Sequence, residues 1–142
     1  MSFHSIECMS WFQLFGLPES FIIDLDALEK AYVLAQKRIH PDRWTGVSFK
    51  TAEQFSAHIN KVYAALKDPR KRGEYMLKCV NFWPISSFPK IMQEIFSLKM
   101  NSDPQAVHIL YQESLIKFDK FLKEKDFFQA QKAYLYICYL GK

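Results

Sequence analysis

The sequence predicts an all-α protein, and three observations lead to that class. The 142-residue chain contains only four glycines, fewer than a turn-rich β-protein would use. Long runs place apolar residues three and four positions apart, which is the period of one helix face. Hydrophobic residues make up 49% of the chain and aromatic residues 16%, enough for a core and too much for a disordered chain. We expect an antiparallel helical hairpin followed by a three-helix bundle.

The first two helices are predicted at residues 11–16 and 25–39. The first is almost wholly apolar, so we expect it to be buried. The second begins after Asp24, a favourable N-cap residue, and ends near His40 because the following proline disfavours helical geometry there. Its predicted core face is a series with helical spacing: Leu25, Leu28, Tyr32, Ala35 and Ile39.

A loop at residues 43–50 is expected to precede a third helix at about residues 53–66. Thr51 and Gln54 have the spacing of a capping box. Its predicted packing stripe, facing the second helix, is Phe55, Ile59, Val62 and Leu66. Asp68 can then cap a fourth helix with Pro69 at its first position. The fourth helix carries four basic residues and three apolar anchors: Arg70, Lys71, Arg72, Lys78, and Tyr75, Met76, Leu77.

Residues 81–88 are predicted to form a linker. The stretch NFWPISSFP at 81–89 contains two prolines and two serines, and we expect its aromatic side chains to pack between the two halves of the chain. Three helices follow, at residues 89–101, from Asp103 to about Lys125, and from Asp126 to Gly141, with both aspartates as N-caps. The domains are therefore expected at residues 1–80 and 89–142.

The bulk composition limits the choice of partners and compartment. The 19 basic and 15 acidic residues give a net charge of +4, too weak to imply nucleic acid. The three cysteines are far apart and odd in number, so reduced thiols and no metal site are expected. The N-terminus resembles no signal peptide, and no apolar run is long enough to span a membrane. We expect a soluble, cytoplasmic protein with no membrane or nucleic-acid partner and no cofactor.

The tripeptide His40, Pro41 and Asp42 is the most informative motif. It lies between the second and third predicted helices, so an imidazole, a rigid ring and a carboxylate are expected to be exposed in a loop. One interpretation is a docking device. The alternative is an ordinary helix stop with a surface histidine and a capping aspartate.

The surrounding sequence matches a known family. Residues 11–18 read WFQLFGLP, 24–32 DLDALEKAY, 40–44 HPDRW, 59–69 INKVYAALKDP and 70–77 RKRGEYML. With this order and spacing, the chain resembles the J domain of DnaJ-type co-chaperones. The FGLP start and the R-x-E-Y-x-L segment resemble the HscB branch, the J proteins of iron–sulfur cluster assembly.

The resemblance implies a way of acting on a chaperone. Residues 1–80 would be a J domain that docks on the ATPase domain of a DnaK- or HscA-type chaperone and triggers ATP hydrolysis. His40, Pro41 and Asp42 would be the triggering residues, acting by biasing the conformation of the partner. The residues expected to attract an acidic chaperone surface are Lys30, Lys37, Arg38 and Arg43. The alternative for these basic residues is an ordinary solvated helix face.

The helix at 89–101 carries two apolar stripes. Ile91, Ile95 and Leu98 form one, and Met92, Phe96 and Met100 form another, turned around the helix axis. A small bundle cannot easily bury both. The second stripe either binds a partner or packs against the linker or the J domain, and the sequence leaves these alternatives open.

Residues 88–142 resemble the HscB client-binding bundle more loosely. The resemblance implies binding of an IscU-type iron–sulfur scaffold protein through an apolar and acidic patch. Phe96 and Lys99 stand where the family usually carries acids, which departs from that pattern. The expected client-binding residues are Ile91, Met92, Ile95, Phe96 and Tyr139.

The resulting functional prediction is a co-chaperone rather than an enzyme. His40 and Asp42 are held apart by Pro41, and no nucleophile or oxyanion site accompanies them. The protein is expected to deliver an IscU-type scaffold to a DnaK-type chaperone and to stimulate its ATP hydrolysis. Two alternatives are a J-domain protein that serves a different client and a basic helical nucleic-acid-binding module, whose binding would depend steeply on salt.

Overall fold

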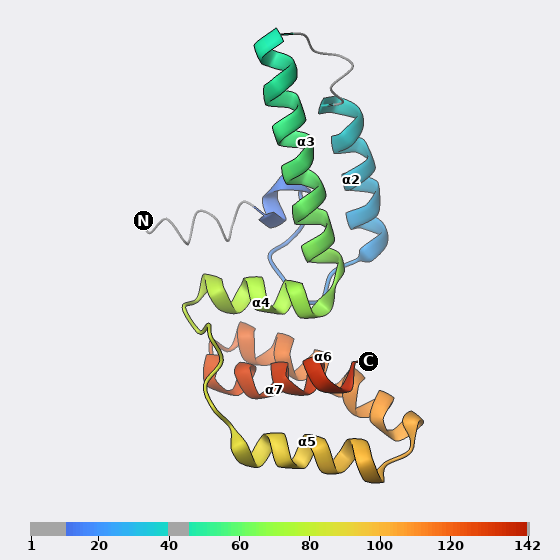
Figure 1. Cartoon of the computed structure of the whole chain (residues 1–142), viewed down its shortest axis with the longest axis vertical. Helices are drawn as coiled ribbons and strands as arrows, with labels where there is room; N and C mark the ends of the chain where they lie inside the picture. Colours follow the sequence, from blue (N-terminus) through green and yellow to red (C-terminus); the bar gives the residue numbers. More distant parts are fainter. Residues whose placement is uncertain (1–10, 40–45, 142) are drawn as a thin grey trace. The chain divides into compact units, whose positions relative to one another are not determined.

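The computed structural model describes residues 11–39 and 46–141, without the side chains of residues 46–48. One helical turn at residues 11–14 precedes the longer helices (Figure 1). These are α2 (Leu25–Ile39), α3 (Gly46–Lys67), α4 (Pro69–Cys79), α5 (Pro89–Asn101), α6 (Pro104–Lys123) and α7 (Phe127–Leu140). The described residues contain no strand, and the predicted all-α class is confirmed.

The chain divides into two compact units, an N-terminal unit of residues 1–72 and a C-terminal unit of residues 73–142. The N-terminal unit holds α2, α3 and the first turn of α4, and the C-terminal unit holds the rest of α4 together with α5, α6 and α7. This division falls inside α4, earlier than residue 80. The domain limits expected from the sequence stay a prediction.

The N-terminal unit is built on the hairpin of α2 and α3, which run side by side in opposite directions (Figure 1). Ile59, Val62 and Leu66 of α3 are buried, which confirms three of the four residues of its predicted stripe, whereas Leu28 is the one buried member of the predicted α2 stripe. The short first helix is confirmed as part of the core by Phe12, which is 1% exposed. Burial of these side chains removes apolar surface from water and stabilises the hairpin.

The tip of the hairpin differs from the prediction. Because α3 begins at Gly46, Thr51 and Gln54 lie inside the helix, and the predicted capping box is wrong. Residues 46–52 contain no proline that would prevent the helix from starting earlier. Ala52, seven residues before Ile59 and on the same helix face, is also buried. The predicted burial of Phe55 is also wrong, since its side chain is 45% exposed.

One member of the predicted α2 stripe is exposed as well. Leu25 is the first residue of α2 and is 52% exposed, contrary to its predicted place in the core. The Ser56 hydroxyl donates to the Gln36 side-chain oxygen at 2.8 Å, which places the neighbouring Phe55 near the last turn of α2. Helical spacing identifies the face on which a residue lies but not how deeply its side chain is buried.

A polar and aromatic seam also joins α2 to α3. The Tyr32 and Tyr63 rings stack with centroids 4.0 Å apart. The Tyr32 hydroxyl and the Gln36 amide nitrogen both donate to Oδ1 of Asn60, the latter at 2.8 Å. These hydrogen bonds fix the register of the two helices, because a shift along the axis would break them together.

Arg72, one of the four basic residues of α4, is buried. Its side chain is 6% exposed. The Nε–H group donates to the carbonyl oxygen of Phe21 at 2.7 Å, and Nη1 donates to that of Leu66. The guanidinium group also lies over the Phe21 ring, 4.8 Å from its centroid. Arg72 thereby connects the segment before α2, the end of α3 and the start of α4.

In the C-terminal unit, α7 packs against both α6 and α5 (Figure 1). Asp103 and Asp126 cap α6 and α7, accepting hydrogen bonds from the backbone N–H groups of Ala106 and Gln129, so both predicted caps are confirmed. The buried apolar side chains of α5, α6 and α7 are Ile95, Phe118, Ala130, Ala133, Tyr134, Ile137 and Leu140.

The aromatic side chains of residues 81–88 pack on α7. The ring pairs and their centroid distances are Phe82–Phe127 at 5.2 Å, Trp83–Tyr134 at 5.9 Å and Phe88–Phe128 at 5.1 Å. Gln131 of α7 also donates to the carbonyl oxygen of Phe82 at 2.8 Å. The Trp83 ring also lies near Lys78 of α4, whose Nζ atom is 5.6 Å from the ring centroid. These rings belong to the C-terminal unit, and the expected packing between the two halves of the chain stays a prediction.

Gly73 allows α4 to approach two aromatic rings of the C-terminal unit closely. A Cβ atom at this position would lie 2.7 Å from Cε1 of Tyr134 and 3.4 Å from Cε2 of Phe118. Both rings are buried, so neither is free to swing into solvent. The absence of a side chain at Gly73 is therefore a packing requirement rather than a need for unusual backbone angles.

Replacement of Arg72 by methionine is expected to destabilise the fold. The change leaves the buried carbonyl oxygens of Phe21 and Leu66 without their donors, which costs about 3 kcal/mol of unfolding free energy. Urea unfolding followed by circular dichroism measures the loss. Lys71→Met is the matched control at the neighbouring exposed position, with an expected effect within about 0.5 kcal/mol. Equal effects of the two substitutions would contradict the anchoring role of Arg72.

Replacement of Gly73 by alanine should also destabilise the protein, against the usual trend. Alanine within a helix normally gains about 1 kcal/mol over glycine. Here the added methyl group meets Tyr134, and we expect a net loss of about 1–3 kcal/mol. In a Tyr134→Leu background the ring is gone, and the same substitution should cost less or stabilise. If Gly73→Ala raised the melting temperature of the protein that retains Tyr134, the rings would be able to move aside without destabilising the fold, which would contradict this prediction.

Candidate partner-binding surfaces

The outer side of α2 carries the first candidate surface. A shallow hollow there is lined by six side chains, here called the α2 face: Asp26, Glu29, Lys30, Val33, Leu34 and Lys37. Lys30 and Lys37 are exposed and border the same hollow, as their seven-residue spacing predicts. Val33 is 45% exposed and Leu34 is 50% exposed.

The α2 face is therefore mixed rather than purely basic. The positive charges of its two lysines are balanced by the carboxylates of Asp26 and Glu29. The sequence interpretation did not assign these two acids to the α2 face. Two exposed aliphatic side chains lie between the charges. Such a surface can combine apolar contact with charge steering toward a partner.

Five predicted docking or triggering residues are not part of this hollow. Arg38 is exposed in the last turn of α2 but does not line the hollow. The remaining four, His40, Pro41, Asp42 and Arg43, lie outside the described residues. Their triggering and docking roles stay predictions.

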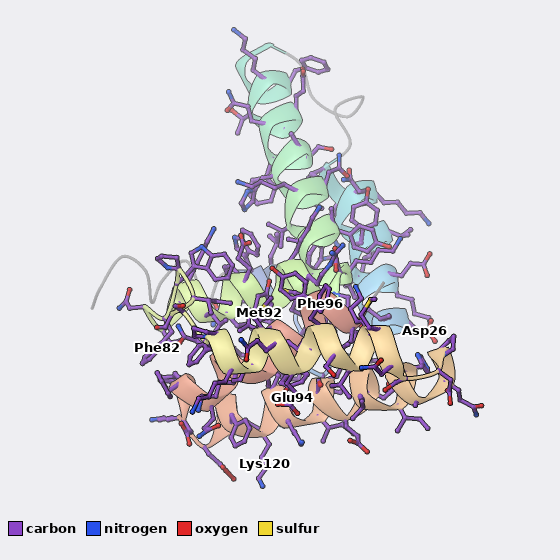
Figure 2. The ribbon with its side chains drawn as sticks, turned by 60° about the horizontal axis from the view of Figure 1, so that its bottom comes forward. Asp26, Phe82, Met92, Glu94, Phe96 and Lys120 are labelled. Carbon is purple, nitrogen blue, oxygen red and sulfur yellow. The ribbon has the colours of Figure 1, made fainter. Side chains whose placement is uncertain are left out.

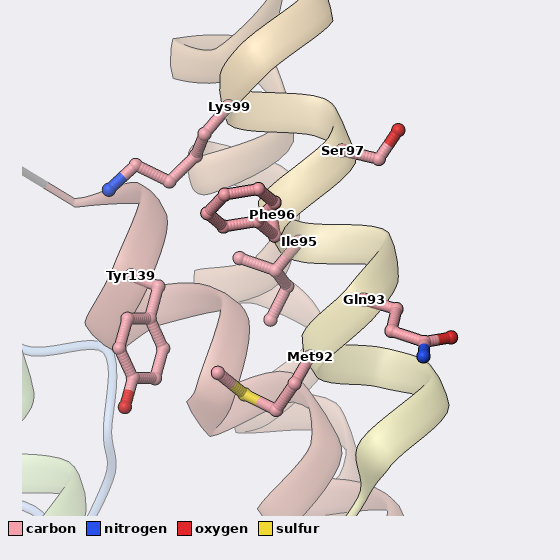
Figure 3. A pocket seen from close by; sticks show the side chains of 7 residues that line it. All are labelled: Met92, Gln93, Ile95, Phe96, Ser97, Lys99 and Tyr139. Carbon is pink, nitrogen blue, oxygen red and sulfur yellow. The ribbon is translucent and has the colours of Figure 1, made fainter.

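A second candidate surface is an apolar groove along α5 and α7, with a volume of about 480 Å³. Figure 3 shows the side chains that line this α5–α7 groove: Met92, Gln93, Ile95, Phe96, Ser97, Lys99 and Tyr139. Four of the five predicted client-binding residues are among them. Ile91, the fifth, is half-buried and does not line the groove.

The packing of α5 explains how the groove forms. Ile95 is 1% exposed and forms the floor, where α5 meets α7. Met92 and Phe96 lie on the same side of α5, with Glu94 on the other (Figure 2). Phe96 is 67% exposed and Met100 70%, so these members of the second stripe are open to solvent rather than packed inside. Tyr139 of α7, 44% exposed, borders the groove from the opposite side.

Glu94 has a separate role away from the groove. It forms a side-chain hydrogen bond with Tyr136 of α7. Burial, this hydrogen bond and the nearby negative charge raise the pKa of Tyr136 from 10.0 to about 12. The phenol therefore remains protonated at neutral pH and can donate its proton to the carboxylate, joining α5 to α7.

A neighbouring hollow lies beyond the end of the groove. Its lining comes from the end of α5, the start of α6 and the end of α7, and comprises Lys99, Ser102, Pro104, Val107, His108, Tyr111, Leu140 and Gly141. Lys99 borders both the groove and this adjacent hollow. The sequence interpretation did not identify the hollow, because its residues come from three separate helix ends.

Two kinds of feature were sought in the part of the chain that the structure describes: a cluster of metal-ligating side chains and a membrane-spanning helix. Over residues 11–39 and 46–141, no group of three or more histidine, cysteine or carboxylate side chains is placed to hold a metal ion. None of the helices in these ranges is long and apolar enough to cross a membrane. Cys79 and Cys138 are half-buried and form no disulfide.

Comparison with known proteins identifies the N-terminal unit. Residues 10–75 match the family model of the DnaJ domain. The chain is 44% identical over 69 residues to the "Co-chaperone protein HscB homolog" of Bordetella avium, an alignment that covers 46% of this chain and 41% of that protein. A homologue of the same name from Vibrio cholerae is 43% identical over 72 residues, covering 49% and 42%. The matched region thus spans less than half of these relatives.

Solved structures extend the likeness to both units. The chaperone HscB from Vibrio cholerae superposes with a TM-score of 0.72 at 26% identity, covering 92% of this chain and 90% of that one. The human co-chaperone HscB gives a TM-score of 0.77 at 20% identity, covering 92% and 76%, and this second match bears on the fold alone. A hairpin followed by a helical bundle is therefore an arrangement found in solved proteins.

Proposed function

Because the chain is an HscB-type J-domain protein, we propose that it is a co-chaperone in iron–sulfur cluster assembly. In this role it stimulates ATP hydrolysis by a DnaK- or HscA-type chaperone and delivers an IscU-type scaffold protein to it. The observation that carries the proposal is the pairing of a DnaJ domain in residues 10–75 with an exposed apolar groove in the C-terminal unit. The protein needs no catalytic centre, because it acts through binding.

The α2 face is the proposed docking surface for the chaperone. Lys30 and Lys37 attract acidic groups and speed the encounter, while Val33 and Leu34 offer apolar contact once the surfaces meet. Arg38 and Arg43 flank the tripeptide in the sequence and are proposed to add to the attraction. His40, Pro41 and Asp42 then bias the ATPase domain toward its hydrolysing conformation.

The α5–α7 groove is the proposed client site. Met92, Phe96 and Tyr139 offer exposed apolar surface around a floor made by Ile95. Met and aromatic side chains are common at protein-binding surfaces, since they combine large area with adaptability. Ile91 lies one helical turn before Ile95, is half-buried, and is proposed to add to the client contact from beside the groove. We place this activity in the reducing cytoplasm, which suits Cys79 and Cys138 because neither is in a disulfide.

A J-domain protein that serves another client is the main alternative. The observation in its favour is the presence of Phe96 and Lys99 where the family usually carries acids. A nucleic-acid-binding role has less support, because Asp26 and Glu29 accompany the lysines of the α2 face and would repel phosphate groups.

Substitution of His40 by glutamine is expected to remove ATPase stimulation. The rate of single-turnover ATP hydrolysis by the cognate chaperone should fall to that of the chaperone alone, because the triggering imidazole is lost. Scaffold binding and the melting temperature should stay unchanged. Loss of scaffold binding as well would mean that the tripeptide supports the fold, and undiminished stimulation would refute its triggering role.

Truncation of the groove side chains should weaken client binding alone. Met92→Ala combined with Phe96→Ala is expected to raise the Kd for the IscU-type scaffold about 10- to 100-fold, measured by titration calorimetry. Chaperone stimulation in the absence of scaffold should be unaffected. Ile109→Ala with Ile116→Ala is the matched control, since these exposed side chains of α6 do not line the groove. Equal losses in both double variants would argue against a groove-specific client site.

A further inference from the structure

The α5–α7 groove has an unbalanced charge. Lys99 is the one charged side chain among the described residues that line it, and the others are apolar or neutral polar groups. Figure 3 shows the Lys99 side chain at one end of the groove, beyond Phe96. Its position follows from helical spacing, because Lys99 lies seven residues after Met92 and therefore on the same face of α5.

No carboxylate of the two groove-forming helices balances this charge. α7 contains no acidic residue, and the one acid of α5 is Glu94. Glu94 lies on the side of α5 away from Met92 and Phe96 and is engaged with Tyr136 (Figure 2). Within the described ranges the structure gives Lys99 no ion pair. The ammonium group is therefore open to a carboxylate from outside the chain.

The adjacent hollow continues the same character. Lys99 borders it, and its other lining residues include His108 and Tyr111 but, among those described, no aspartate or glutamate. A partner that crosses from the groove into the hollow thus meets apolar surface with Lys99 at the junction. A basic group of the partner would face an uncompensated positive charge there.

We infer that the partner of the α5–α7 groove is a protein segment that presents an acidic side chain beside its apolar contact residues. The apolar residues contact Met92, Phe96 and Tyr139, and the carboxylate pairs with Lys99. This inference rests on the proposed client-binding role of the groove and names the chemistry of the client surface. The observed neutral and apolar lining around a single cation fits such a segment better than a polyanion, which requires several cations.

A charge-reversal series in the full-length chain tests this inference, with the cognate IscU-type scaffold as the probe. Lys99→Glu should weaken scaffold binding about tenfold and Lys99→Gln about threefold, because reversal adds repulsion to the lost attraction. Lys90→Glu is the matched control: it makes the same charge change on α5 at an exposed residue that lines neither hollow. Its Kd should change less than about twofold.

Salt dependence provides the second measurement. Wild-type affinity should fall as salt is added, and this dependence should be lost in Lys99→Gln while the Lys90→Glu protein keeps it. Unchanged or tighter binding by Lys99→Glu would overturn the acidic-partner inference and leave the client role intact. Absence of any wild-type binding to the scaffold would overturn both the client role and this inference.

Discussion

Two consecutive residues of α4 organise the two units. Arg72 holds the backbone carbonyls of Phe21 and Leu66 in the N-terminal unit, and Gly73 leaves room for the Tyr134 ring in the C-terminal unit. A buried guanidinium group costs desolvation free energy unless its donors are satisfied, and a close-packed ring tolerates no extra methyl group. Arg72 thus holds the start of α4 within the N-terminal unit, and Gly73 lets the continuation of α4 pack closely on Tyr134 within the C-terminal unit.

The exposure of the α5–α7 groove follows from the limited packing around α5. This helix packs against α7, so Ile95 is buried, whereas Phe96 and Met100 of the second stripe remain at the surface. Ile95 stabilises the seam by leaving water almost completely, whereas Phe96 and Met100 gain little from the fold itself. Apolar side chains that contribute little to folding yet remain exposed are typical of binding surfaces. In the same arrangement Glu94 lies on the side of α5 away from the groove, and Lys99 is the charged side chain among the described residues that line it.

Local signals predicted much of this structure. The bounds of α5, the caps at Asp103 and Asp126, and the buried stripe of α3 all follow from spacing and capping chemistry. The sequence could not show that Arg72 is buried, because its partners lie on distant segments. It likewise misplaced the start of α3. For the groove, helical spacing placed Met92 and Phe96 on one face. That no carboxylate of α5 or α7 balances the charge of Lys99 there could be seen only once the positions of Glu94 and α7 were known.

In the proposed function, the α2 face acts on the chaperone and the α5–α7 groove binds the client. Single-turnover ATP hydrolysis, with and without scaffold, tests it with two double variants of the full chain. Lys30→Glu with Lys37→Glu should reduce stimulation under both conditions. Met92→Ala with Phe96→Ala should abolish the extra stimulation given by scaffold and preserve the rest. If both double variants lose both activities equally, with their folds intact, the separation of the two roles is contradicted.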